Sequence, residues 1–158
     1  MGDFMLIRLS YASQYQPTEQ NLLEDLRTIL VTARAVNTAE GICGVLYYAH
    51  GHFFQCLEGE AHNVMRVYAK IQRDSRHTIL KCFEIEHIAQ AQFSQWSMKY
   101  AKSNSMLQNF LNKHNIHSFK PQNLAQHDLA EFIRLLLKAN SLSIKTSIGN
   151  HRGYQHYF

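Results

Sequence analysis

Residues 42–59 of this chain read ICGVLYYAHGHFFQCLEG, two apolar segments separated by a tight turn. The segments 42–48 and 52–58 have the length and the aromatic and β-branched content of strands. His50 and Gly51 lie between them, so the pattern predicts a β-hairpin. Gly59 is expected to end the second strand.

Gln55 is the unusual residue of this hairpin. The alternation of side chains along a strand places it on the same face as Phe53 and Leu57, which belong in a core. Each unsatisfied donor or acceptor of a buried amide costs about 1–3 kcal/mol. Gln55 therefore either finds backbone partners or faces a water-filled gap or a bound molecule that offers both donors and acceptors.

Composition places the chain among single-domain globular proteins. It has 158 residues, of which 46% are hydrophobic, enough for a substantial core. It contains no run of about 18 apolar residues, and its first residues do not resemble a secretory signal, so no membrane association is expected. Cys43, Cys56 and Cys82 are odd in number and widely spaced, which is typical of reduced cysteines in a cytoplasmic protein.

The charge and the histidines exclude two further classes. The net charge of +4 is modest and the basic residues are scattered, so direct nucleic-acid binding is not expected. The ten histidines include pairs, but none of the pairs has further ligands at metal spacing, so no metal site is predicted.

The remaining pattern predicts an α+β fold with the order βαββαββ. A strand is expected at 5–11, and a helix at 18–36 with Thr18 as its N-cap. A second amphipathic helix is expected around 64–71, and two more strands at 79–86 and 96–100. This order is typical of a ferredoxin-like sheet with two helices on one face.

The pattern becomes helical after residue 101. Apolar stripes at 106–111 and 129–136 must be buried, and we expect these helices to pack on the free face of the sheet. Asp128 and Glu131 form a possible capping box for the second of them. We therefore divide the chain into a domain at 1–101, a helical extension at 102–141 and a flexible polar tail at 142–158.

Five motifs occur in a characteristic order. Tyr11 ends the first strand and is followed by Ala-Ser, Asn37 begins the stretch NTAEGICG, and Gln55 precedes CLEG. Residues 74–77 read DSRH, and residues 96–98 read WSM. This ordered set resembles the BLUF family, the blue-light sensors that use flavin, over about residues 5–101. The flavin-binding part of the chain is therefore expected at 1–101.

The resemblance implies noncovalently bound FAD and a role for each motif. Tyr11 matches the tyrosine that donates an electron to the excited flavin, and Gln55 the glutamine between that tyrosine and the ring. Asn37 matches an asparagine that hydrogen-bonds the ring. Trp96 and Met98 match two residues thought to exchange places near the glutamine, and the sequence does not say which of them faces inward.

The resemblance also implies a basic end of the site, where the chain departs from the family pattern. Arg76 and His77 match a basic pair near the ribityl and phosphate groups. Lys70 stands where many members have an arginine, and it lacks the bidentate fork of a guanidinium. Val36 stands where several members have a second asparagine, and Cys43 where threonine is common.

Taken one at a time, these residues also have structural explanations. Tyr11 could be an edge tyrosine with a hydrated hydroxyl, and Asn37 could be a helix C-cap. Trp96 and Met98 could be ordinary core residues. The functional interpretation depends on their co-occurrence.

We therefore predict a cytoplasmic blue-light receptor that is a sensor and not an enzyme. It is expected to form homo-oligomers and to signal to a downstream regulatory protein, such as a transcription regulator or a response-regulator-like protein. One alternative is a small flavin oxidoreductase, although the chain lacks the Gly-x-Gly-x-x-Gly fingerprint of dinucleotide binding. Another is a ferredoxin-like RNA-binding module, which would need a clustered basic patch.

Overall fold

The computed structural model of the fold describes residues 4–116, 118–145 and 155–157, with side chains for 4–116 and 118–143. Its centre is a six-stranded sheet with the strand order β4-β1-β3-β2-β6, in which β5 also pairs with β1. The β2–β6 pairing is parallel and the other pairings are antiparallel. The strands are β1 (Leu6–Tyr15), β2 (Cys43–Ala49), β3 (His52–Glu60), β4 (His77–Cys82), β5 (Glu86–His87) and β6 (Lys99–Tyr100).

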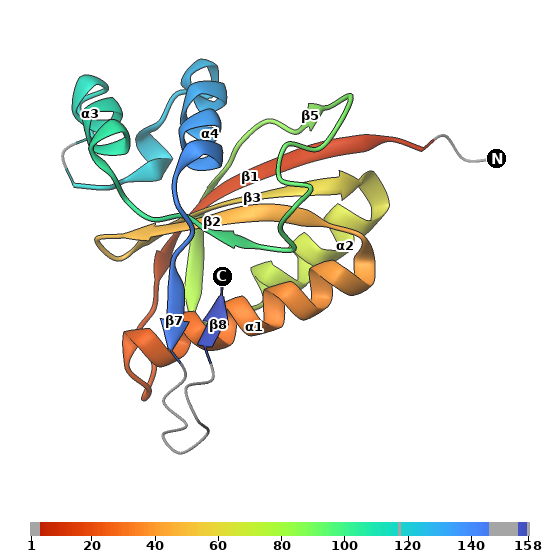
Figure 1. The fold of residues 1–158 in the computed structure, drawn as a ribbon, viewed down its shortest axis with the longest axis horizontal. Helices are drawn as coiled ribbons and strands as arrows, with labels where there is room; N and C mark the ends of the chain where they lie inside the picture. The colour runs from red at the N-terminus through yellow and green to blue at the C-terminus, as the bar shows by residue number, and fades with distance from the viewer. Residues whose placement is uncertain (1–3, 117, 146–154, 158) are drawn as a thin grey trace.

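Helices cover both faces of this sheet (Figure 1). Helices α1 (Leu22–Glu40) and α2 (Ala61–Gln72) lie on one face, and α3 (Ser105–Lys113) and α4 (Leu129–Lys138) lie on the other. The short 3₁₀ turns η1 (Pro121–Asn123) and η2 (Gln126–Asp128) connect α3 to α4. The predicted α+β, ferredoxin-like fold with C-terminal helices on the second face is confirmed.

The turn of the hairpin follows from its two residues. His50 and Gly51 have φ values of 51° and 79°, the left-handed conformation that a tight two-residue turn requires. The predicted end of the second strand at Gly59 is wrong, because β3 continues to Glu60 and Gly59 stands opposite Ile7 of β1. The pairing with β1 carries the strand through the glycine, beyond the last pair with β2 at Cys43 and Glu58.

The first helix begins and ends later than its pattern suggested. The N-cap is Asn21, whose side chain accepts a hydrogen bond from the Glu24 amide at 2.8 Å, and not Thr18. The Thr18 hydroxyl donates to the buried Asp25 carboxylate instead. The helix ends at Glu40 and is capped by Gly41, which has a φ of 68°, so it continues past the predicted end near Asn37.

Other boundaries differ because long-range pairing decides them. The strand predicted at 79–86 is divided into β4 and β5, and the strand predicted at 96–100 has ladder bonds only at Lys99–Tyr100. The capping box predicted at Asp128 does not form, since Asp128 has a helical conformation and its side chain caps nothing. The preceding turn η2 leads directly into α4 and replaces that cap.

Two apolar clusters fill the space on the two sides of the sheet. The cluster beneath α1 and α2 includes Leu9, Leu30, Leu46, Leu57 and Val64. The cluster beneath α3 and α4 combines residues from 12–101 with residues of the helical extension. Its largest members are Tyr47, Phe54, Phe83, Phe93, Phe110, Phe119 and Phe132. The predicted domain and its extension therefore share one core.

The chain after α4 returns along β6. The amide of Leu142 donates to the Tyr100 carbonyl, and β7 (Ser143–Lys145) pairs with β8 (Gln155–Tyr157). The predicted flexible tail at 142–158 stays a prediction, because residues 146–154 and 158 lie outside the described residues. None of the described helices has the length and apolar character needed to cross a bilayer.

Candidate functional site

A cavity of about 160 Å³ opens between α1 and α2, with the sheet as its floor. This volume is roughly ten times the smallest void that holds a water molecule, so it can accommodate a ring-sized group. Strands β1, β2 and β3 provide its floor, including Tyr11, Leu46 and Gln55. Helix α1 provides Val36 and Asn37 on one wall.

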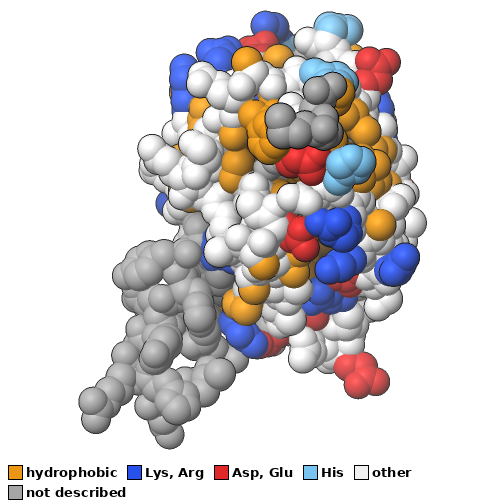
Figure 2. Space-filling model, turned by 90° about the vertical axis from the view of Figure 1, so that its right-hand side faces the viewer, with side chains coloured by type: hydrophobic (Ala, Val, Ile, Leu, Met, Phe, Trp, Pro, Cys, Tyr) orange, Lys and Arg blue, Asp and Glu red, His pale blue; other side chains and the backbone are white. Residues whose placement is uncertain are grey.

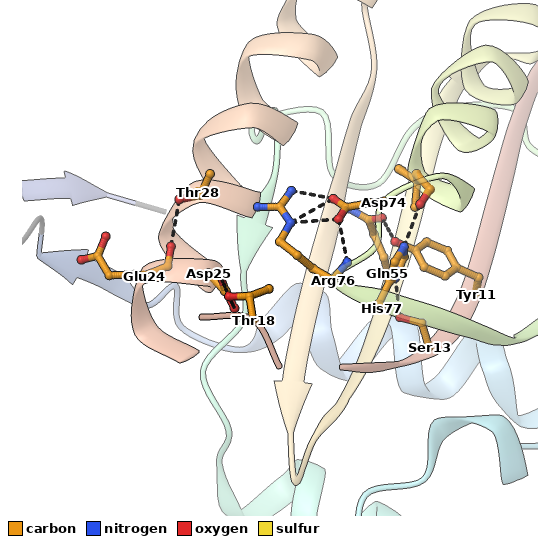
Figure 3. A network of polar contacts seen from close by, with 11 residues as sticks. Tyr11, Ser13, Thr18, Glu24, Asp25, Thr28, Gln55, Asp74, Arg76 and His77 are labelled. Carbon is orange, nitrogen blue, oxygen red and sulfur yellow. Dashed lines mark hydrogen bonds and ion pairs between the residues drawn. The ribbon is translucent and has the colours of Figure 1, made fainter. Parts of the chain in front are cut away.

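Tyr11 and Gln55 form a hydrogen bond on this floor (Figure 3). They stand directly opposite each other on the antiparallel strands β1 and β3, and each is only 3% exposed. The Tyr11 hydroxyl donates to Oε1 of Gln55. Burial raises the pKa of Tyr11 well above its ordinary value, and nearby Tyr68 and Asp74 raise it further. Tyr11 therefore keeps its proton at neutral pH and is available as a donor.

The amide nitrogen of Gln55 has only a weak acceptor among the described residues. Its Nε2 lies 3.7 Å from the sulfur of Met98, and a thioether accepts hydrogen bonds poorly. The amide carries two N–H groups in a buried position, so a bound molecule with a carbonyl or ring nitrogen would complete its bonding. The cavity beside Gln55 thus fits a polar aromatic group.

The structure decides which of Trp96 and Met98 lies near Gln55. Met98 is 1% exposed and belongs to the cluster beneath α1 and α2. Trp96 is half-buried and packs against the cluster on the opposite side of the sheet, with its ring 6.4 Å from that of Phe93. Met98 is therefore the inward residue in this structure.

Helix α1 holds the segment that carries these two residues. The amide nitrogen of Asn37 donates to the Ser97 carbonyl at 2.6 Å. Nε and Nη2 of Arg34 donate to the Met98 carbonyl at 3.0 and 2.7 Å, and burial lowers the pKa of Arg34. Sequence reasoning missed Arg34, although it lies one helical turn before Asn37 and shares its face.

A polar wall closes the other end of the cavity, where Lys70, Asp74, Arg76 and His77 all line it. Arg76 makes an ion pair with Asp74 at 2.5 Å, which lowers the pKa of that carboxyl. The two ring nitrogens of His77 lie 2.9 Å from the Ser13 hydroxyl and 2.7 Å from a backbone carbonyl of α2. This end is therefore basic but internally bonded (Figure 3).

The structure thus brings the six residues predicted to bind the cofactor to one cavity. They are Tyr11, Asn37, Gln55, Lys70, Arg76 and His77. The amides of Asn37 and Gln55 offer donors and acceptors for a heterocycle, and the basic side chains suit anionic groups. The other two predicted site residues, Trp96 and Met98, do not line it, although the Met98 sulfur lies 3.7 Å from Nε2 of Gln55.

Comparisons with known proteins agree with this geometry. Residues 6–99 match the BLUF family, described as sensors of blue-light using FAD. The structure of BlsA in its photo-activated state is 45% identical, with a TM-score of 0.83 over 87% of this chain and 99% of that one. The BlsA ground state is 43% identical, with a TM-score of 0.85 over 91% and 95% of the two chains.

Curated relatives are much longer proteins. The photoactivated adenylate cyclase subunit beta of Euglena gracilis is 33% identical over 101 residues, which is 63% of this chain and 12% of that protein. Subunit alpha from the same organism is 41% identical over 76 residues, 48% of this chain and 7% of that protein. The chain thus spans only a small part of these relatives.

Proposed function

The chain belongs to the BLUF family of blue-light sensors that use FAD, and we propose that it senses blue light with the Tyr11–Gln55 hydrogen bond as its switch. The main support for this proposal is that the buried Tyr11 phenol donates a hydrogen bond to Gln55 on the floor of the cavity between α1 and α2. Such a pair would place two groups beside a bound flavin ring: a proton donor, and an amide that can exchange the positions of its donor and its acceptor.

The residues on the cavity wall suit FAD. The amides of Asn37 and Gln55 would bond the polar edge of the ring, and Val36 offers only apolar contact where an amide is common. Arg76 and His77 would serve the ribityl and phosphate end, with Lys70 as a single positive charge. Arg76 would have to share its guanidinium between Asp74 and a phosphate.

We assign the photochemical steps to two side chains. The bound flavin supplies the absorption of blue light and a one-electron acceptor. Tyr11 gives up one electron, and its phenolic proton moves to Oε1 of Gln55. When the electron and a proton return to Tyr11, the Gln55 amide is left rotated or tautomerised, with donor and acceptor exchanged. The products equal the reactants in composition, so the chain acts as a sensor and not as an enzyme.

The signal would leave through Met98. A changed Gln55 amide no longer offers the same group to the Met98 sulfur, and residue 98 is bonded to α1 through its backbone. A difference of a few kcal/mol between the two arrangements is enough to shift a two-state equilibrium substantially. The change at Met98 would then reach strand β6, which begins at the next residue, and after it the C-terminal helices.

We propose that the chain passes its light signal on by binding a partner protein. The apolar stripes of α3 and α4 are buried on the sheet, so a partner would bind the outer surface of the extension. We propose a cytoplasmic homo-oligomer that regulates a transcription regulator or a response-regulator-like protein. The free cysteines Cys43, Cys56 and Cys82 support a reducing compartment.

Absorption spectroscopy tests the proposal. Purified protein should be yellow, release unmodified FAD on denaturation and show a small red shift after blue light that reverses in the dark. Colourless protein that cannot be reconstituted with FAD would contradict the proposal. Rapid oxidation of NADH would favour the flavin oxidoreductase instead.

Surface charge argues against the RNA-binding alternative. Figure 2 shows basic side chains interspersed with acidic and apolar ones on the face that it presents. A module that binds nucleic acid gathers its basic residues into a patch or stripe. Tyr47 and Phe54, the large aromatics on one sheet face, are buried under α3 and α4 and could not stack on bases.

A further inference from the structure

Lys99 is a buried lysine to which the proposed switch assigns no task. It follows Met98 directly, and its side chain points to the opposite face of the sheet, toward α4. It is 1% exposed, and burial lowers its pKa. Because burying an ammonium group is unfavourable without good partners, its contacts call for an explanation.

The ammonium group makes two contacts in the described structure. Nζ donates to the Leu137 carbonyl at 2.7 Å and lies 4.5 Å from the centre of the Trp96 ring. Leu137 is in the last turn of α4, where carbonyls lack partners within the helix and carry partial negative charge. Lys99 thus binds the end of α4 and the face of Trp96 at the same time.

We propose that Lys99 is a positioning residue that couples the Trp96–Met98 segment to the C-terminal end of α4. The proposal rests on the proposed function, since a change at Gln55 is what would move Met98. Movement of the backbone at residue 98 shifts Lys99, and a charge-assisted hydrogen bond transmits that shift directionally to the helix. A movement of the Trp96 ring would act on the same ammonium group.

Backbone contacts next to Lys99 extend this link. The Lys102 amide donates to the Asn140 carbonyl and the Leu142 amide to the Tyr100 carbonyl, both at 2.7 Å. These bonds tie the chain that follows α4 to the chain that follows Met98. Lys99 is the side chain that reaches into the helix itself.

Lys81 provides a matched control because it has the same kind of contacts in a different place. Its Nζ donates to the Leu124 carbonyl at 3.0 Å and lies 4.6 Å from the Phe83 ring centre. Lys81 is on β4, at the opposite edge of the sheet from β6, and Leu124 precedes α4. Both lysines thus hold the helical extension, but only Lys99 adjoins Met98.

Hydrogen exchange on the full-length, flavin-loaded protein tests the proposal, comparing wild type with Lys99→Met and Lys81→Met. Methionine keeps most of the volume of lysine and removes the charge and the donor. All three proteins should keep the light-induced red shift. The light-minus-dark difference in exchange over residues 129–142 should persist in Lys81→Met and fall to about one third or less in Lys99→Met.

The outcomes separate this proposal from the proposed function. Three results would overturn the coupling role. The light-minus-dark difference in exchange could stay at its wild-type size in Lys99→Met, or it could be lost equally in Lys81→Met. It could also be absent in the wild type although the red shift is normal. Absence of the red shift in the wild type would overturn the proposed function and the coupling with it. If Lys99→Met does not fold, Lys99→Gln, which is too short to reach Leu137, should give the same loss; failure of both variants to fold would assign Lys99 a structural role only and overturn the proposal.

Discussion

The two faces of the sheet are built from the same strands but packed differently. The face beneath α1 and α2 contains a cavity, a buried tyrosine–glutamine pair and a weakly bonded amide. The face beneath α3 and α4 is filled by aromatic rings around Phe132, with centroids 4.9 Å from Phe54 and 5.6 Å from Phe110. One face can hold a ligand, and the other provides stability.

Neighbouring residues therefore have different tasks. Gln55 faces the cavity, whereas its neighbours Phe54 and Cys56 belong to the dense face. Met98 likewise lies beneath α1 and α2, whereas the next residue, Lys99, reaches α4 on the dense face. A substitution on the dense face beneath α3 and α4 should change stability. A substitution on the cavity face beneath α1 and α2 should change photochemistry. The predictions below test that separation, from the largest expected effect to the smallest.

Phe132→Ala should be strongly destabilising. The side chain is fully buried among aromatic rings, and removing it leaves a cavity in the dense face. We expect a loss of about 3–5 kcal/mol in the free energy of unfolding, measured by urea titration. Val36→Ala, on the cavity wall, is the control and should cost less than about 1.5 kcal/mol. Equal losses would contradict the separation of the two faces.

Glu58→Gln should weaken a buried ion pair on the dense face. Oε2 of Glu58 accepts two hydrogen bonds from the Arg8 guanidinium. Oε1 accepts hydrogen bonds from the backbone amides of Gln92 and Phe93 at 2.9 and 2.8 Å. The neutral amide leaves Arg8 without its buried counter-charge, so unfolding should become easier by roughly 2–3 kcal/mol. The amplitude of the flavin red shift should be retained, and loss of that amplitude would show that the faces are not independent.

Gln55→Leu should abolish the red shift while keeping bound flavin. Leucine removes every hydrogen bond of the amide at similar volume, and the change in unfolding free energy should stay within about 1 kcal/mol. Difference spectra after blue light measure the effect. A normal red shift in this variant would mean that another group is the switch.

Tyr11→Phe should bind flavin and lose the normal photocycle. The ring remains, but the phenolic proton and the oxidisable hydroxyl are absent. Tyr15→Phe on the same strand is the control, because the Tyr15 hydroxyl bonds Asp25 and not Gln55. Transient absorption should show wild-type behaviour in the control alone, and a wild-type quantum yield in Tyr11→Phe would exclude Tyr11 as the donor.

Arg34→Met should have the smallest effect. It removes the two hydrogen bonds from α1 to the Met98 carbonyl, so residue 98 is held less firmly. We expect the dark recovery rate to change by about three- to tenfold at an unchanged shift amplitude. Arg27→Met, which removes only a pair with Glu24 within α1, should recover at the wild-type rate. Equal rates in both variants would show that this contact is not part of the switch.

Local periodicity explains why much of the fold could be predicted. The alternation that put Gln55 with Phe53 and Leu57 is an intrinsic property of a strand, and it holds in the structure. The helical stripes of the extension had to be buried, and the free sheet face was available. Boundaries were less accurate where capping by Asn21 moved the start of a helix or pairing with β1 extended a strand.

By itself, the sequence determined the order of the secondary-structure elements and the faces of the central strands, because these follow from spacing along the chain. Through the resemblance to the BLUF family, the order of the motifs also indicated six of the residues that line the cavity. Only the tertiary structure decided that Met98 faces Gln55 while Trp96 lies on the opposite side. It alone placed Arg34 on the Met98 carbonyl and Lys99 on α4. The reason is physical: the segment before β6 is irregular, so its orientation depends on hydrogen bonds to residues far away in the chain, which local spacing does not encode.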